Sequence, residues 1–533
     1  MKNTAGPENK ICTSRRKAIR DLLLIFICLV SGMLYASALP PLNWNWAILF
    51  VLPVLFYCGL YGRWYFRLLC GWVWGLGWSL FAYRFLREIH PAVPWLLAPV
   101  ISLWPALFTL LAGFWARRCC GGQLSAEKIS ALPPGTMLRY LSGAAVLFTL
   151  TEWSRYYLFV WNDLSVTLWQ VPVLMQIARL TGRYGVSLLI TLANAALFAL
   201  IFCRKRRWMV SGILLLYPLA AVIYGTAVMN IPEKSGDNVI WRCALIQGNL
   251  PEQRIASAQE VVNSIRVYTQ LSHRMKQFSP QTIIWPECAV PIPLREQYQL
   301  GEIYRYAVKS LKTQMLIGSL DITADDGITN SALLLSPDGE ITGRYDKFHR
   351  VPYGEYVPFR ELLPESWIEK FDMGRDLTAG KEIRPLDITG DIRSGTAVCY
   401  EGVFSYLSAA FARKGANVLT VLSNDVWYPQ SSEPEQHLAN AVMRCVETGL
   451  PMVRCGNNGG SGVVNKYGVF TSYIGSAARR PELLREQAAG IVEVKLERHP
   501  EVTPAVFMEN WIIYLLMILL GTGILFPAVP VKK

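Results

Sequence analysis

Runs of apolar residues about twenty positions long fill most of the chain up to residue 230, and one more run follows at 510–531. A helix needs roughly 20 mainly apolar residues to cross the hydrocarbon core of a bilayer. The pattern therefore predicts a membrane α-helical bundle of about eight spans. We place the spans near residues 22–39, 46–61, 67–86, 94–115, 139–160, 184–203, 208–228 and 511–529.

Residues 231–508 show a different pattern, in which short β-rich runs alternate with helical stretches. The predicted strands cover 239–249, 281–287, 314–322, 330–337, 394–401, 417–425, 450–459 and 460–468. The predicted helices cover 257–278, 304–311, 404–415 and 434–449. Each of these helices precedes a buried strand, and this order predicts an α/β domain with helices packed on mostly buried sheets.

These two patterns divide the chain into three parts. We predict a seven-span membrane domain at 1–230, a globular domain at 231–508, and a C-terminal span with its tail at 509–533. A cleaved signal peptide is the alternative for the first apolar segment. No small-residue cleavage site follows that segment cleanly, and ALPP at 38–41 is typical of a tight turn, so we treat the segment as a span.

The formal net charge of +13 lies outside the globular domain. Residues 230–508 hold 29 Lys and Arg against 32 Asp and Glu, whereas the rest of the chain holds 23 against 7. A nucleic-acid-binding domain would gather its basic residues on its own folded surface. The distribution therefore argues against a nucleic-acid partner and in favour of a lipid bilayer.

Basic residues occur in alternate connections between the predicted spans. They are Arg15, Arg16, Lys17 and Arg20 in the N-terminal tail, Arg63 and Arg67 after the second span, Arg117, Arg118 and Lys128 after the fourth, RKRR at 204–207 after the sixth, and Lys532 and Lys533 at the end. Short cytoplasmic loops carry the excess of Lys and Arg in membrane proteins. Both termini are therefore predicted to be cytoplasmic, and the globular domain is predicted to lie on the opposite side.

Two charged residues interrupt the fifth predicted span, where Glu152 and Arg155 lie three positions apart. Charged side chains at membrane depth are costly and usually face a cavity or each other, although a pair near the interface can also extend toward water. The 12 cysteines show no spacing typical of metal ligands or of a disulfide framework. We therefore predict neither a metal nor a cofactor.

Chemically versatile residues stand where several predicted strands end. Glu287 ends TIIWPE, Cys399 ends GTAVC, and Asn424 and Asp425 end VLTVLSND, while Lys347 lies in a connection rich in aromatic residues and proline. Functional side chains of α/β folds gather at the carboxyl ends of strands. A base, an electrophile and a nucleophile could therefore meet on one rim. Taken alone, each residue is more typical of an ordinary role: Glu287 of a solvated cap, Lys347 of a surface charge and Cys399 of a buried thiol.

Four motifs resemble the nitrilase superfamily of carbon–nitrogen hydrolases. They are WPECAVP at 285–291, YDKFHRVPYGEYVPFRELL at 345–363, VCYEGVF at 398–404 and SNDVWY at 423–428. Together with ALIQGNLPEQ at 244–253, TEW at 151–153 and spans on both sides, they make nearly the whole chain resemble the apolipoprotein N-acyltransferase family of Gram-negative bacteria. The resemblance implies an αββα sandwich for the globular domain.

The resemblance also implies roles for single residues. Glu287 would be the general base, Lys347 the lysine that stabilises the oxyanion, and Cys399 the nucleophile. The supporting or substrate-binding positions would be Glu355, Tyr400, Glu401, Trp285, Asn424 and Asp425. The chain departs from the usual family pattern at Gly402, at Leu450 and in RCGNNGG, and these departures concern the substrate pocket more than the triad.

A member of this family would move a fatty acyl group from a phospholipid, through a cysteine thioester, to the N-terminal α-amine of diacylglyceryl apolipoproteins. We expect phosphatidylethanolamine as the donor, and an inner-membrane location with the catalytic domain in the periplasm. The acceptor suits the chemistry, because an α-amine with a pKa of roughly 8 is neutral at pH 7 far more often than a lysine.

The segment 347–371 is rich in apolar residues. They are Phe348, Val351, Tyr353, Val357, Phe359, Leu362, Leu363, Trp367 and Phe371. Packing of an ordinary loop is one interpretation. The other is an amphipathic lid that rests on the outer leaflet, admits acyl chains and keeps water from the thioester.

Three other interpretations remain open. A membrane-anchored amidase or acyl hydrolase would use the same triad, and a Cys–His dyad would pair Cys399 with His349 or His437. A transporter or scaffold should show internal repeats or several charges within its spans. Neither a G-x-S-x-G elbow nor an HExxH zinc helix occurs in the sequence.

Overall fold

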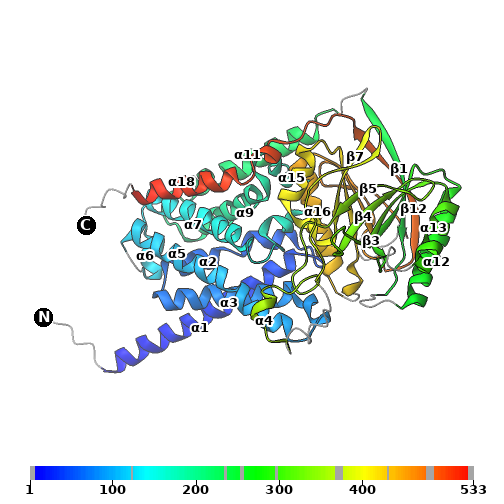
Figure 1. Cartoon of the computed structure of the whole chain (residues 1–533). Coiled ribbons are helices and arrows are strands. Elements are labelled where there is room, and N and C mark those ends of the chain that lie inside the picture. The colour runs from blue at the N-terminus through cyan, green and yellow to red at the C-terminus, as the bar shows by residue number, and fades with distance from the viewer. Residues whose placement is uncertain are drawn as a thin grey trace. The chain divides into compact units, whose positions relative to one another are not determined.

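The computed structural model describes residues 7–121, 124–232, 237–251, 257–293, 298–365, 376–428, 431–475 and 485–525, and these form two compact units (Figure 1). The helical unit comprises Met1–Leu168, Arg183–Thr226 and Asn510–Lys533. The sandwich unit comprises Trp169–Gly182 and Ala227–Glu509. Our division at residue 230 places Trp169–Gly182 with the membrane part. In the structure the long helix is broken at Gly182, where φ is 62° and ψ is −176°, and the residues before the break group with the sandwich.

The helical unit consists of helices with short 3-10 turns between them. Its elements are α1 (Pro7–Ala38), η1 (Asn45–Phe50), α2 (Pro53–Leu60), α3 (Trp64–Ala82), η2 (Arg84–Glu88), α4 (Val93–Ile101), α5 (Leu103–Cys120), α6 (Ala126–Ser130), α7 (Pro134–Arg155), η3 (Leu164–Leu168), most of α9 (Ala178–Phe202), α10 (Arg207–Leu214), most of α11 (Leu216–Met229) and α18 (Trp511–Leu525). Figure 1 shows α1, α3 and α5 side by side, and α3 packs against both neighbours.

Helices occur at all eight predicted span positions, but only some satisfy the requirements for a span. Within the described residues, three segments are long and apolar enough to cross a membrane: Arg15–Ala38, Val93–Cys120 and Ala178–Phe202. A fourth would be the pair α10 and α11, which is bent by 43°. Pro218 explains the bend. Its ring would clash with the carbonyl group of Leu214, four residues earlier, in a straight helix. The described residues thus contain three candidate spans, or four with the bent pair, and the full set of eight spans stays a prediction.

The fifth predicted span ends earlier than the apolar pattern indicates, because α7 stops at Arg155. Its two charged residues hold the chain that follows. Glu152 accepts a hydrogen bond from the backbone N–H of Leu164 at 2.7 Å, and Arg155 donates to the carbonyl of Trp161 at 2.9 Å. Arg155 also donates to the hydroxyl of Tyr83 at 2.8 Å. These charges therefore fix a buried connection through hydrogen bonds to the backbone.

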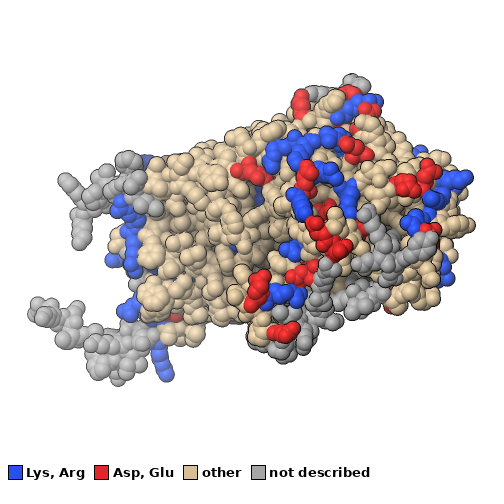
Figure 2. Space-filling model, in the orientation of Figure 1, with Lys and Arg blue, Asp and Glu red and all other residues tan. Residues whose placement is uncertain are grey.

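The face of the helical unit seen in Figure 2 has few charged residues along its length. Figure 2 shows a band of uncharged surface along this unit, with Lys and Arg at the end near both termini. Backbone hydrogen bonds join the basic connections there, from Leu124 to Leu60 and from Arg204 to Ser130. The connections after the second, fourth and sixth predicted spans, which carry basic residues, therefore lie near one another.

Two six-stranded sheets form the centre of the sandwich unit. The first has the order β12-β1-β2-β3-β4-β5 and the second has the order β11-β10-β9-β8-β7-β6. The strands of the first are β1 (Asn238–Gln247), β2 (Thr282–Val290), β3 (Gln314–Ile322), β4 (Ile328–Leu335), β5 (Ile341–Asp346) and β12 (Ala488–Glu497). Those of the second are β6 (Leu386–Thr389), β7 (Ile392–Val398), β8 (Val418–Ser423), β9 (Met452–Gly456), β10 (Gly462–Val464) and β11 (Phe470–Tyr473).

Both sheets follow one plan. Strands β1, β2 and β3 are parallel to one another, as are β7, β8 and β9, and antiparallel strands flank each set. Strand β2 packs against β8 and β9 of the opposite sheet. The carboxyl ends of two parallel sets therefore supply side chains to one region between the sheets.

Helices cover the outer faces of the sheets and complete an αββα sandwich (Figure 1). Helices α12 (Ala258–Lys276) and α13 (Tyr298–Leu311) cover the first sheet, and α15 (Ser405–Arg413) and α16 (Glu433–Thr448) lie on the side of the second. Ser257 and Glu260 form a capping box that starts α12. The smaller elements are α8 (Pro172–Met175), η4 (Arg360–Leu362), η5 (Cys399–Val403), η6 (Asp425–Trp427) and α17 (Pro504–Phe507).

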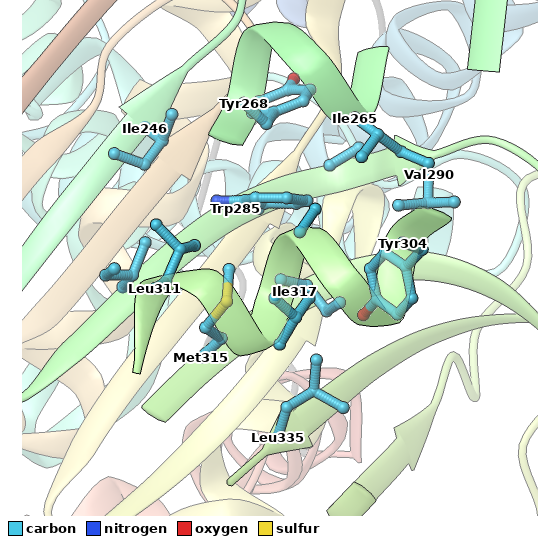
Figure 3. Close-up of a cluster of buried hydrophobic side chains, with 14 of the residues drawn as sticks. Ile246, Ile265, Tyr268, Trp285, Val290, Tyr304, Leu311, Met315, Ile317 and Leu335 are labelled. Atoms are coloured by element: carbon cyan, nitrogen blue, oxygen red, sulfur yellow. The ribbon is translucent and has the colours of Figure 1, made fainter. Parts of the chain in front are cut away.

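A buried hydrophobic cluster joins α12 and α13 to the first sheet (Figure 3). Trp285 of β2 is fully buried there, stacks on Tyr268 and donates its indole N–H to Ser272 at 2.9 Å. Burial of a large aromatic side chain contributes a few kcal/mol. The cluster therefore fixes the part of β2 that immediately precedes Glu287.

The sequence pattern misses four strands, all of them at or next to a sheet edge. Strands β5, β6 and β11 are four to six residues long and contain exposed or half-buried positions. They lack the continuous apolar run of a central strand, which is the signal that identifies the buried ones. Strand β12 alternates between buried and partly exposed residues, and pairs antiparallel with β1 over its whole length.

Candidate active site

Three strands of the sandwich bring a carboxylate, an ammonium and a thiol together. Glu287 lies near the end of β2, Lys347 directly follows β5, and Cys399 directly follows β7. Lys347 Nζ lies 3.5 Å from Glu287 Oε1, and the Glu287 carboxylate shares a hydrogen bond with the thiol of Cys399. The structure thus brings together the three residues that the sequence identifies as a possible base, electrophile and nucleophile.

The backbone around Glu287 departs from regular strand geometry. The pairing of β2 with β3 is irregular between Trp285 and Val290, and Cys288 has a φ of 50°. A bulge of this kind redirects a side chain out of the regular alternation. Gly318 on β3 lies directly against Pro286 and Glu287, so any side chain at position 318 would collide with their backbone. Glycine is required there to let β2 bend toward the site.

A second carboxylate holds the ammonium group of Lys347. Glu355 Oε1 lies 2.8 Å from Lys347 Nζ, and Glu355 Oε2 accepts the backbone N–H of Val351 at 2.8 Å. Asn330 donates to Glu287 Oε1 at 2.8 Å and to Glu355 Oε1 at 2.9 Å. Asn330 on β4 therefore links the two acids on either side of the lysine.

Glu401 fixes the turn that carries Cys399. Its Oε2 accepts the backbone N–H of Val398 at 2.9 Å, and its Oε1 accepts the backbone N–H groups of Phe348 and His349 at 2.7 and 2.9 Å. The carboxyl group thus joins the segment after β7 to the segment after Lys347. Burial raises the pKa of Glu401 to about 7, against the lowering effect of the backbone hydrogen bonds.

Burial dominates the electrostatics of the three central groups. It raises the pKa of Glu287, and Lys347 opposes that rise. It also raises the pKa of the Cys399 thiol well above its usual range, and the neighbouring Glu287 raises it further while Lys347 lowers it. Burial acts to lower the pKa of Lys347, but Glu355 and Glu287 outweigh it and raise that pKa well above its usual range. At neutral pH the site therefore holds a charged ammonium and a protonated thiol.

The other predicted site residues take different places. Trp285 belongs to the hydrophobic cluster, and Tyr400 packs edge to face against Phe404. Asn424 accepts a hydrogen bond from Asn457 at 3.0 Å, which itself bonds the loop after β1. Asp425 is buried and pairs with Arg454 at 2.6 Å. These residues support the strand ends around the triad.

Sequence reasoning missed Asn330, Arg454 and the actual position of His437. His437 donates from Nε2 to the backbone carbonyl of Cys399 at 3.0 Å, which differs from the thiol contact of a Cys–His dyad. His349 lies against Phe404, and burial lowers its pKa to about 4. An isolated Asn within a strand carries no recognisable signal, because only the folded sheet brings β4 beside β2.

One group around Cys399 has a geometry that a metal could use. The ligand atoms of Cys399, Asp425 and His437 lie within 4.8 Å of one another. These groups already have protein partners. Asp425 pairs with Arg454, and His437 contacts Asp425 through Nδ1 and the Cys399 carbonyl through Nε2. Cys28, Cys58 and Cys70 form a similar buried group in the helical unit.

The connection after Lys347 exposes several large apolar side chains. The exposed fraction is 75% for Phe359, 79% for Leu362 and 52% for Tyr353. Val357 is buried and anchors the segment. Trp367 and Phe371 of the predicted lid lie outside the described residues. The described part of the loop thus presents an apolar surface.

The αββα fold with its Glu–Lys–Cys cluster defines a carbon–nitrogen hydrolase domain, here in a chain with membrane-type helices. The family model for carbon-nitrogen hydrolase matches residues 242–485, and the model for the apolipoprotein N-acyltransferase N-terminal domain matches residues 31–196.

Relatives match over most of both domains. The apolipoprotein N-acyltransferase of Geobacter metallireducens is 32% identical over 84% of this chain and 86% of its own length. The enzymes of the same name from Allorhizobium ampelinum and Rhodopseudomonas palustris are 27% and 29% identical, over 85% and 84% of this chain and 89% and 87% of their own lengths. The chain belongs to the apolipoprotein N-acyltransferase family, and it is an acyltransferase.

The hydrogen bond from Asn330 supplies the first prediction. Asn330→Leu keeps the side-chain volume but removes the N–H donors, and a hydrogen bond to a charged group contributes about 1.5–3 kcal/mol. Because this bond lowers the pKa of Glu287, we expect its loss to raise that pKa. Infrared titration of the carboxyl band, assigned with Glu287→Gln, should show the midpoint at higher pH. Asn263→Leu on α12 is the control, and an unchanged midpoint in Asn330→Leu would contradict the prediction.

Proposed function

We propose that this chain transfers a fatty acyl group from a phospholipid to the N-terminal α-amine of the diacylglyceryl-cysteine of apolipoproteins. In this proposal Cys399 is the nucleophile, Glu287 the general base and Lys347 the group that stabilises the oxyanion. The observation that carries it is the convergence of these three groups, with Glu287 and Lys347 buried and Cys399 half-buried beside them. The family and the membrane-type helices agree with a lipid donor and a lipoprotein acceptor.

The first half-reaction consumes the phospholipid ester. Glu287 takes the proton of the thiol as Sγ attacks the ester carbonyl, and the negative charge on the carbonyl oxygen is stabilised by the Lys347 ammonium. When the intermediate collapses, the carbon–oxygen bond of the ester breaks. Glu287 returns its proton to the leaving alkoxide, so that a lysophospholipid leaves as the alcohol and the acyl group stays on Cys399 as a thioester.

The second half-reaction forms the amide. The neutral α-amine attacks the thioester carbonyl, Glu287 takes a proton from the attacking nitrogen, and the sulfur leaves and regains its proton. An α-amine has a pKa of roughly 8, so a useful fraction is neutral near pH 7. Lys347 again faces the developing oxyanion. Both steps therefore need the same two charged groups.

The protonated thiol suits a lipid enzyme. A permanently ionised thiolate would be open to oxidants and to water-borne electrophiles. With the proton held between Cys399 and Glu287, the nucleophile becomes reactive only as a carbonyl group reaches it. The raised pKa of Glu287 gives the carboxylate more basicity than an exposed one, which favours this transfer.

The acyl donor, the membrane and the apolar loop surround the catalytic groups of the enzyme. Phosphatidylethanolamine is the proposed donor. We also propose an inner-membrane location with the sandwich in the periplasm and both termini in the cytoplasm. The proximity of the basic connections after the second, fourth and sixth predicted spans supports this orientation. The apolar surface of Phe359 and Leu362 is proposed to rest on the lipid and to shield the thioester from water.

The roles of the triad predict separate kinetic losses. Glu287→Gln should slow acyl-enzyme formation by about 10²–10⁴-fold, the usual effect of losing a general base. Lys347→Met should slow both half-reactions by about 10²–10³-fold, the usual effect of losing one oxyanion donor. Rapid-quench measurements with labelled phospholipid, before and after a diacylglyceryl-cysteine peptide is added, separate the two steps.

Cys445→Ala, at a buried thiol of α16, is the control and should acylate normally. The thioester should vanish in Cys399→Ala. Normal acylation by Cys399→Ala would refute the nucleophile assignment. Rapid discharge of the thioester to water without the peptide would instead favour the amidase-like hydrolase.

The orientation can be measured independently of catalysis. A periplasm-dependent phosphatase fused at residue 232 should be active, and the same reporter fused after Lys533 should be inactive. A reporter active only in the cytoplasm should give the reverse pair. An active phosphatase after Lys533 combined with an inactive one at 232 would overturn the proposed orientation.

The apolar loop predicts a dependence on the physical form of the donor. Phe359→Ser with Leu362→Ser should weaken turnover of phospholipid in vesicles more than turnover of a short, water-soluble thioester, because only the former requires contact with lipid. Phe278→Ser, at another exposed phenylalanine of the sandwich, is the control. Equal losses on both donors would show that the loop acts through packing.

A further inference from the structure

Two arginines lie at the end of α3 that is opposite to its basic connection. Helix α3 begins directly after Arg63, and its 19 residues span about 28 Å, close to the thickness of a hydrocarbon core. The short helix η2 follows α3 and carries Arg84 and Arg87. Cytoplasmic connections normally hold the excess of basic residues, so two arginines at the far end of α3 depart from the pattern of this chain.

Buried side chains hold η2 firmly on the helical unit. Tyr83, which precedes η2, is fully buried and donates its hydroxyl to the carbonyl of Trp161 at 3.1 Å. Phe85 and Leu86 are buried as well, and the ring of Phe85 lies 5.8 Å from that of Trp161 between centroids. The turn is therefore a fixed support for the residues on its outer face.

The two guanidinium groups are exposed on one face of this turn. Residues three positions apart eclipse each other in a 3-10 helix, so Arg84 and Arg87 lie one above the other. Within the described residues, neither group has a hydrogen bond or an ion pair. His90 is also exposed, and its Nδ1 accepts the backbone N–H of Ala92 at 3.2 Å, which leaves Nε2 as the donor. Two cations and one N–H donor are therefore available to a ligand.

An apolar surface begins beside these groups. Helix α4 packs against η2, and its residues Trp95 and Leu96 are 69% and 71% exposed. Val100 and Leu103 continue the exposed apolar surface along the chain. Tryptophan is typical of the headgroup level of a membrane. Cations followed by apolar side chains match a phospholipid, in which the phosphate is followed by acyl chains.

We propose that Arg84, Arg87 and His90 bind the phosphate group of a phospholipid in the outer leaflet, whose acyl chains lie along Trp95 and Leu96. Guanidinium groups bind phosphate through two parallel hydrogen bonds, and this geometry favours arginine at phosphate sites. An acidic peptide would match the charges but not the apolar surface that follows them. The inference rests on the proposed function, for which this site would hold the acyl donor, and on the proposed orientation.

Photocrosslinking tests the site without catalysis. The probe is phosphatidylethanolamine with a diazirine near the glycerol end of one acyl chain, added to the purified protein in detergent. We expect the label within residues 84–103 by mass spectrometry, and less of it when unlabelled phosphatidylethanolamine is added. Arg84→Gln with Arg87→Gln should lower the labelling about ten-fold, because two charge-assisted hydrogen-bond donors are lost. Arg15→Gln with Arg16→Gln, at exposed arginines of α1, is the control and should label as the parent does.

The competitors identify the group that is recognised. Inorganic phosphate that competes as well as the phospholipid at equal concentration would indicate a site for free phosphate. Diacylglycerol that competes equally well would show that the phosphate is not recognised. Either result would overturn the inference, and so would unchanged labelling of the double variant.

Kinetic measurements connect the site to the reaction. In Arg84→Gln with Arg87→Gln, the KM for phospholipid should rise about ten-fold at an unchanged kcat, while turnover of a short, water-soluble thioester should stay the same. A rise in the KM for the diacylglyceryl-cysteine peptide instead would assign the arginines to the acceptor and contradict the inference. Failure of the parent to form an acyl-enzyme would refute the proposed function, and photocrosslinking would still decide whether a phospholipid binds at η2.

Discussion

The ammonium of Lys347, enclosed between Glu287 and Glu355, is the interaction on which the rest of the site depends. A buried charge is tolerated only when it is paired and hydrogen-bonded. Here Glu355 Oε1 lies at 2.8 Å and Glu287 Oε1 at 3.5 Å from the nitrogen, with Asn330 bonded to both acids. The shorter contact lets Glu355 neutralise the lysine. Glu287 is left with a raised pKa and can exchange a proton with Cys399.

Three local departures from regular backbone geometry position these groups. The irregular strand at Glu287, the glycine at position 318 and the left-handed backbone of Cys399 all depart from regular geometry within a few residues of the triad. Glu401 on one side and His437 on the other hold that strained turn. The hydrophobic cluster around Trp285 supplies a rigid base for the distorted strand (Figure 3).

The central strands, the helices and the triad could be predicted from the sequence because each has a local signal. Buried parallel strands appear as continuous apolar runs, and Glu287 and Cys399 stand at their ends inside recognisable motifs. Asn330 and Arg454 could not be predicted, since their importance depends on strands that are adjacent only in the folded sheets. The end of α7 at Arg155 was missed for a similar reason. Glu152 and Arg155 form hydrogen bonds with backbone groups of the segment after the helix, which the sequence pattern does not reveal.

The central claim is that the resting nucleophile is a neutral thiol whose proton is shared with Glu287 beside a charged lysine. The stretching band of the S–H group tests it most directly, in the infrared difference spectrum between the parent protein and Cys399→Ala. We predict that the parent shows the band of Cys399 at pH 7, and that it disappears only at a pH above the usual thiol pKa of roughly 8.5. A difference spectrum without this band at pH 7 would show a preformed thiolate and would contradict the account.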